Sequence, residues 1–181
     1  VKRTRQQIRD ELDRLKANVM VSGGAGSATA SITTTRENLP AVLDLVGEML
    51  REPSFPANEF EQLKQQQIAG IERMKSEPQM IAVLALQRHL APYPKDDVRY
   101  VPTLEEQIAE IQAVELEDLR RFHQEFYGSS AGEITLVGDF DREAAQVQIR
   151  KLFGDWKSAA GYRRIPRPFQ PVEARKEVFQ T

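Results

Sequence analysis

Apolar residues recur every three or four positions along much of the chain, and this spacing favours amphipathic helices. In the first such segment Ile8, Leu12 and Leu15 form one stripe, and Thr4 with Gln7 has the spacing of a capping box. Similar patterns predict helices over residues 38–50, 58–75, 78–90, 103–111, 116–126 and 141–153. Helices are therefore expected to dominate the middle of the chain.

Two of these helices carry distinct signals at their starts, and a third stands out for its composition. Asn58 with Glu61, and Thr103 with Glu106, each have the capping-box spacing, which begins a helix by satisfying free backbone N–H groups. The segment Met80–Leu90 is apolar on nearly all sides rather than along one stripe. Because such a helix has no polar face for water, we expect it to be buried.

A β-hairpin is predicted between the first two helices. Asn18–Ser22 and Ser27–Thr35 are the two strand candidates, and the second alternates apolar with hydroxyl-bearing side chains. The glycine-rich run Gly23–Gly26 lies between them and is interpreted as their connection.

The stretch from residue 131 to residue 156 predicts a strand, a turn and a helix. Glu133–Val137 is short, β-branched and apolar, as expected of an interior strand. Asp139 marks the turn, Asp141 is placed to cap the next helix, and Gly154 stands where a left-handed C-cap is expected. The predicted fold class is therefore α+β, with helices packed on one face of an antiparallel or mixed sheet.

Composition limits the functions that fit this chain. It has 181 residues, a formal charge of −2, a pI near 5.8 and no cysteine. The charge gives no general attraction to nucleic acid, no apolar run is long enough to span a bilayer, and disulfides and thiolate metal sites are excluded. The cytosol and an oxidising compartment are both compatible with this composition.

The chain changes character after Trp156. Residues 158–171 hold three prolines and three arginines with little periodicity, which is typical of a linker, and residues 173–180 predict a short last strand. We therefore expect one α+β domain over residues 1–157, followed by a linker and possible short strand over residues 158–181.

Few residues are candidates for chemistry. Gly24 and Gly26 follow a strand but precede another strand, so no helix N-terminus is available for a phosphate, and a structural turn is favoured. His89 and His123 lie far apart and belong to no zinc motif with two histidines one helical turn apart, so both are interpreted as structural.

The remaining charged groups also have structural interpretations. The acidic pairs Asp96-Asp97 and Asp139/Asp141 are expected to be turn and cap residues. The arginines of the linker could contact an acidic partner, although a solvated linker is favoured; they are Arg163, Arg164 and Arg167.

Several runs along the chain together resemble the insulinase/pitrilysin zinc peptidases, the inverzincin enzymes that include the mitochondrial processing peptidases. The runs are Arg36–Pro40, Leu43–Leu45, Leu50–Pro56, Glu59–Glu61, Phe126–Gly128, Val137–Asp141 and Leu152–Trp156. The resemblance covers most of the chain up to Trp156. It implies a protein of two homologous halves, each an internal duplication of an α+β unit, that close over a peptide.

In this family only one half holds zinc, through H-x-x-E-H and a glutamate on a later helix, where two glutamates stand seven residues apart. The matching helix here carries Glu59, Glu61 and Glu72, and no two of these are seven apart. Glu72 lies close to the position of the family's zinc-binding glutamate, but the chain has no H-x-x-E-H histidines to complete a zinc site with it. The resemblance thus implies the first repeat of the non-catalytic half, without its opening strands and without catalytic, cofactor-binding or metal-binding residues.

The expected function is a catalytically inactive domain that packs against a zinc-bearing half and helps to form a peptide-binding chamber. The partner is then the catalytic half, in the same polypeptide or another subunit, with zinc in that partner and a peptide substrate between them. An exposed sheet edge could also pair with a second copy of the chain.

Two alternatives stay open. One is an assembly or binding subunit that resembles the family, and the other is a fragment of a catalytic half. An H-x-x-E-H roughly 15 to 40 residues before Val1 would favour the second, and its absence from the whole parent sequence would favour the first.

Overall fold

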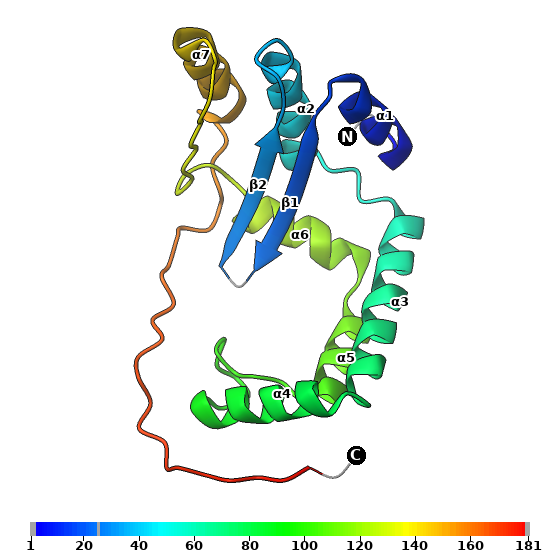
Figure 1. Cartoon of the computed structure of the whole chain (residues 1–181), viewed down its shortest axis with the longest axis vertical. Helices are drawn as coiled ribbons and strands as arrows, with labels where there is room; N and C mark the ends of the chain where they lie inside the picture. Colours follow the sequence, from blue (N-terminus) through cyan, green and yellow to red (C-terminus); the bar gives the residue numbers. More distant parts are fainter. Residues whose placement is uncertain (1–2, 25, 180–181) are drawn as a thin grey trace. The chain divides into compact units, whose positions relative to one another are not determined.

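The structure is a computed structural model that describes residues 3–24 and 26–179. The chain divides into two compact units, one formed by Val1–Ser54 with Leu119–Ile165 and the other by Phe55–Asp118 with Pro166–Thr181. The described elements confirm an α+β fold with a two-stranded antiparallel sheet (Figure 1). None of the helices in the described ranges is long and apolar enough to cross a bilayer.

The elements follow the order expected from the hydrophobic pattern, except that two predicted strands do not form in the described residues. The first unit holds α1 (Arg5–Arg14), β1 (Asn18–Gly24), β2 (Ser27–Thr33), α2 (Leu39–Arg51) and α7 (Arg142–Phe153). The second holds α3 (Ala57–Met74), α4 (Pro78–Leu90) and α5 (Leu104–Ala113). Helix α6 (Leu116–Phe126) begins in the second unit and continues into the first.

Capping boxes begin two of the helices, as predicted. The Thr4 hydroxyl accepts from the Gln7 N–H at 3.2 Å, and the Gln7 side chain accepts from the Thr4 N–H at 2.8 Å. The Thr103 hydroxyl and the Glu106 side chain make the same reciprocal pair at the start of α5. Each pair satisfies two backbone N–H groups that the helix itself leaves free.

The core of the first unit lies between α1, α2 and the hairpin. Leu15, Val42 and Val46 are 3%, 0% and 2% exposed. Val19 pairs with Ile32 across the hairpin, and both pack against this cluster. The hairpin thus has one face on α2, and Gly26 takes a φ of +91° in its turn, a value that glycine adopts easily. Ala25, also assigned to this connection, lies outside the described residues.

The interior strand predicted over Glu133–Val137 is wrong. These residues form no strand, and Ile134 and Val137 are 50% and 93% exposed. An interior strand needs a hydrogen-bonded neighbour on each edge. Within the described part of the chain β1 and β2 pair only with each other, so this segment lacks such neighbours. Residues 173–179 likewise form no strand, and Gln180 lies outside the described residues.

Two predicted helix ends are also wrong. Helix α3 begins at Ala57 after Pro56, so Asn58 lies inside the helix and is not its N-cap residue. Gly154 has φ −64° and ψ −26°, and its N–H still bonds to the Arg150 carbonyl, so it continues the helical turn instead of reversing it. The predicted cap at the other end of α7 is confirmed, because Asp141 accepts from the Ala144 N–H at 2.9 Å.

Helix α4 is not buried, contrary to the sequence prediction. Only Leu84 among its large side chains packs on the core of the second unit, which consists of Ile71, Leu104 and Ile108. The side chains on its other faces remain 38% to 55% exposed; they are Met80, Val83, Leu86 and Leu90. The sequence shows that α4 is apolar, but the few helices of this unit cover only one of its sides.

Candidate functional site

Each histidine has a structural partner, and the two lie in different units. The Nε2–H of His123 donates to the Leu50 carbonyl at 2.7 Å, which ties α6 to the end of α2. The Nε2–H of His89 donates to the Glu173 carbonyl at 2.8 Å. Because a carbonyl can only accept, both contacts require the hydrogen on Nε2.

The side chains of the described residues that could coordinate a metal are not arranged as a zinc site. Glu72 is the residue closest to the position where the family's catalytic halves carry their zinc-binding glutamate. Here it forms an ion pair with Lys75 at 3.2 Å. Within residues 3–24 and 26–179, no group of three or more histidine, cysteine, aspartate or glutamate side chains is arranged to hold a metal ion. Zinc in proteins takes three or four such ligands at about 2.0–2.3 Å.

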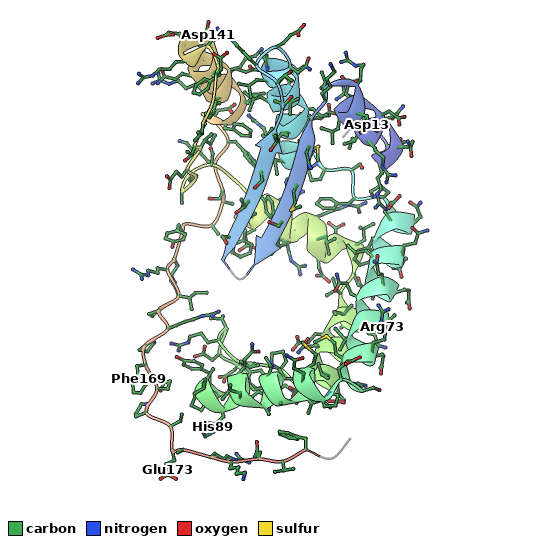
Figure 2. All side chains as sticks on the ribbon, viewed as in Figure 1. Asp13, Arg73, His89, Asp141, Phe169 and Glu173 are labelled. Carbon is green, nitrogen blue, oxygen red and sulfur yellow. The ribbon has the colours of Figure 1, made fainter. Side chains whose placement is uncertain are left out.

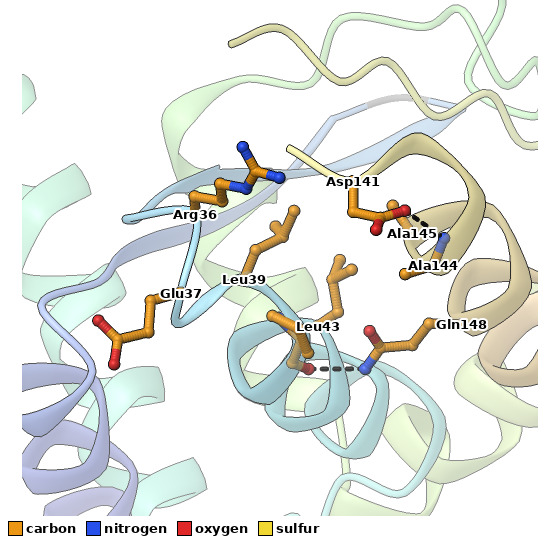
Figure 3. Close-up of a pocket in the computed structure, with 9 residues that line it drawn as sticks. Arg36, Glu37, Leu39, Leu43, Asp141, Ala144, Ala145 and Gln148 are labelled. Atoms are coloured by element: carbon orange, nitrogen blue, oxygen red, sulfur yellow. Dashed lines mark hydrogen bonds between the residues drawn. The ribbon is translucent and has the colours of Figure 1, made fainter. Parts of the chain in front are cut away.

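An open groove of the first unit lies between α2 and α7, as shown in Figure 3. Its volume is about 470 Å³. The lining mixes apolar and polar side chains: Arg36, Glu37, Leu39, Pro40, Leu43, Asp141, Ala144, Ala145 and Gln148.

Most polar groups of this groove already have partners. Arg36 pairs with Asp139 at 2.7 Å, and Gln148 donates to the Pro40 carbonyl at 2.7 Å and to Asp44 at 3.0 Å. The structure thus assigns Asp139 to an ion pair across 103 residues of chain and Asp141 to a helix cap. These contacts join α2 to α7 and present neither an activated nucleophile nor a general base.

The second unit contains a denser polar cluster that the sequence did not single out. Glu106 accepts from Lys95 at 2.7 Å, from the Tyr100 hydroxyl at 2.8 Å and from the Thr103 N–H at 2.9 Å. The hydrogen bond from Lys95, with those from Thr103 and Tyr100, lowers the pKa of Glu106 to about 2. The only sequence signal for this cluster was the capping box at Thr103.

A neighbouring cluster fixes an arginine. Asp97 accepts from two nitrogens of Arg99 at 2.7 and 2.9 Å and from its backbone N–H at 2.8 Å. These hydrogen bonds, led by the side chain of Arg99, lower the pKa of Asp97 to about 2. The Arg99 guanidinium also lies 4.0 Å from the centre of the Tyr93 ring, a cation–π contact. The sequence suggested only a turn residue at Asp97, but in the structure Asp97 also holds the Arg99 side chain in place.

The Glu106 cluster predicts acid sensitivity of the second unit. Because the pKa of Glu106 is lowered on folding, its contribution to stability is full above the unfolded value near 4.5 and is lost as the pH falls toward about 2. We expect the urea midpoint of the Glu106→Gln variant to fall less between pH 5.5 and pH 2.5 than that of the parent. The matched control is Gln112→Ala on the same helix, which removes no carboxylate and should keep the parent's pH profile; identical profiles for both variants would contradict this prediction.

Part of the chain matches a known family model, and a longer part resembles a curated protein. Residues 113–181 match the family model described as "Peptidase M16 inactive domain". The chain is 30% identical over 128 residues to the chloroplastic stromal processing peptidase of Pisum sativum, which is 68% of this chain and 10% of that protein.

The fold has a solved counterpart. A crystal structure of a peptidase M16 inactive domain from Pseudomonas fluorescens matches with a TM-score of 0.70 and 23% identity, over 95% of this chain and 40% of that one. The chain therefore spans well under two thirds of the length of either protein. By sequence, residues 113–181 thus resemble the peptidase M16 inactive domain, and the solved structure shows that its fold is shared over most of the chain.

Proposed function

We propose that this chain is part of the non-catalytic half of a zinc metallopeptidase, where it packs against the zinc-bearing half and walls the chamber that holds the peptide. In this proposal it is the first repeat of its half, with residues 1–157 as the peptidase-like domain and residues 158–181 leading to the next repeat. The observation that carries the proposal is the match of residues 113–181 to the peptidase M16 inactive domain.

Three further observations support it. A relative over 68% of the chain is named as a processing peptidase, which makes polypeptides the expected substrate class. The described residues hold no suitable donor set for zinc, so the metal is expected in the partner half. Helix α6 leaves Phe122 and Phe126 55% and 52% exposed, with their ring centres 4.9 Å apart. Adjacent aromatic rings left in water are typical of a surface that a partner covers.

A wall of this kind acts without chemistry of its own. It positions the peptide and excludes water around the reacting groups of the other half, and both effects lower the barrier only when the two halves are together. The chain alone is therefore expected to be inactive, and the zinc-bearing half alone is expected to be weakly active.

The proposal is tested with the purified chain and the zinc-bearing peptidase M16 partner of its source organism. We expect less than one tenth of an equivalent of zinc in the chain by elemental analysis, no peptide hydrolysis by the chain alone, and co-purification with the partner together with a gain in its activity. One tightly held zinc per chain, or a partner that is fully active without this chain, would exclude the proposed role.

Phe122→Asp provides the surface variant, because a carboxylate in a buried contact loses its hydration. We expect this variant to recover at least tenfold less of the zinc-bearing partner in co-purification than the parent chain does. Val98→Asp is the control, since Val98 is 79% exposed on a loop of the other unit. Equal loss in both variants would point to general destabilisation rather than to a contact through α6.

A further inference from the structure

The described residues after α7 form no helix or strand (Figure 1), yet three hydrogen bonds join their last portion to other residues of the second unit. We call the described residues Pro166–Phe179 the tail. Arg99 donates to the Pro166 carbonyl at 3.2 Å, Gln170 donates to the Tyr93 hydroxyl at 3.1 Å, and His89 donates to the Glu173 carbonyl. We call His89, Tyr93 and Arg99 the clamp.

Two of the three clamp side chains, Arg99 and Tyr93, are also held by contacts that do not involve the tail. Asp97 holds the Arg99 guanidinium through two side-chain hydrogen bonds, and the Tyr93 ring lies against its face. His89 is on the last turn of α4, and Figure 2 shows it on the side of that helix nearest to Glu173. Donors held in this way lose little conformational freedom when they bind, which favours affinity.

Two of the three contacts involve only the tail's main chain. The carbonyls of Pro166 and Glu173 are groups that every polypeptide offers, and only the contact of Gln170 involves a side chain. The large side chain of the tail between these contacts is not recognised, because Phe169 is 90% exposed (Figure 2). The clamp therefore binds mainly the main-chain carbonyls of its occupant and contacts few of its side chains.

The spacing of the contacts defines the shape of the occupant. An extended chain advances about 3.1 Å per residue, so the carbonyls of residues 166 and 173 are separated by roughly 22 Å of chain. A helix over the same residues would advance only about 10 Å. The tail itself has no helical turn and runs as an extended trace in Figure 1, so the occupant of the clamp in this structure is an extended segment.

We propose that the clamp is a binding site for extended polypeptide, recognised through main-chain carbonyls, which the chain's own tail occupies in this structure. An incoming extended peptide of another sequence competes with the tail for the same donors. This inference deepens the proposed function by naming how a substrate chain is held. It is measured on this chain alone, so its failure would leave the packing against the zinc-bearing half untouched.

Displacement of the tail tests the proposal on the full chain. The chain has no cysteine, so Ala174→Cys places a single nitroxide label beside Glu173, and spin-label mobility reports whether the tail is bound. Two peptides are added, one with the sequence of residues 164–176 and one with the same residues in scrambled order. Because a tethered tail has an effective concentration of about millimolar, the peptides are titrated through that range.

We expect both peptides to mobilise the label, with half-effect concentrations within about threefold of each other, since the backbone carries the recognition. In the His89→Ala/Arg99→Ala double variant the label should be mobile before any peptide is added. In the control variant Gln87→Ala, on the same helix, it should be as immobile as in the parent. A response to the native-sequence peptide alone, or to neither peptide, or an immobile label in the double variant, would overturn the proposal.

Discussion

Replacing Val42 by aspartate is expected to unfold the first unit. Val42 is 0% exposed and lies between Leu15 and Val46, so the new carboxylate would be buried among apolar atoms without a partner. An uncompensated buried charge costs several kcal/mol, and a domain is typically stable by only about 5–15 kcal/mol. We expect the free energy of unfolding to fall by about 4 kcal/mol or more, measured by urea titration with circular dichroism.

Val147→Asp is the matched control for this prediction. It introduces the same side chain in α7 of the same unit, at a position that is 68% exposed. A solvated carboxylate there should change the free energy of unfolding by no more than about 0.5 kcal/mol. If Val42→Asp were as stable as this control, Val42 could not lie in the core of the folded chain.

Most features that depend on neighbours in the sequence were predicted well, although the helix ends expected at Asn58 and Gly154 were not. The caps at Thr4, Thr103 and Asp141 involve residues three positions apart, so the sequence contains both partners of each hydrogen bond. The hairpin is of the same kind, because its two strands are adjacent and alternate in polarity. Local geometry decides these features, and the rest of the fold only has to tolerate them.

Features that depend on distant partners could not be predicted in this way. The segment Glu133–Val137 has the composition of a strand, but whether a strand forms is decided by neighbours that composition does not specify. The exposure of α4 has a similar cause, since an apolar helix is buried only if other elements cover it. The ion pair between Arg36 and Asp139 joins residues 103 apart. The clamp could not be predicted for the same reason, because its helix and its loop contact tail residues that are far away in the sequence.

The second prediction with a large expected effect concerns Gly128. A Cβ atom built at this position would lie 2.7 Å from the carbonyl carbon of Lys157 and 2.9 Å from the Cα atom of Ser158, and closer still to the Ser158 nitrogen. These are backbone atoms, which cannot rotate away as a flexible side chain can. Gly128→Ala would therefore push the segment after α7 outward.

That displacement would break contacts that hold the segment in place. The backbone N–H and the hydroxyl of Ser129 each donate to the Trp156 carbonyl at 2.7 Å, next to the point where the clash occurs. With strain and lost hydrogen bonds together, we expect Gly128→Ala to lower the free energy of unfolding by about 2–4 kcal/mol. Trp156 is the only tryptophan of the chain, so its fluorescence reports the displacement directly.

Gly161→Ala is the control for this substitution, because no atom lies within 4 Å of the position that its Cβ would occupy. Since alanine restricts the unfolded chain more than glycine does, Gly161→Ala should leave the stability unchanged or raise it slightly. A Gly128→Ala variant with parental tryptophan fluorescence and parental stability would show that the backbone of residues 157–158 does not pass against Gly128. The segment that leads from α7 toward the tail would then take another course from the one described.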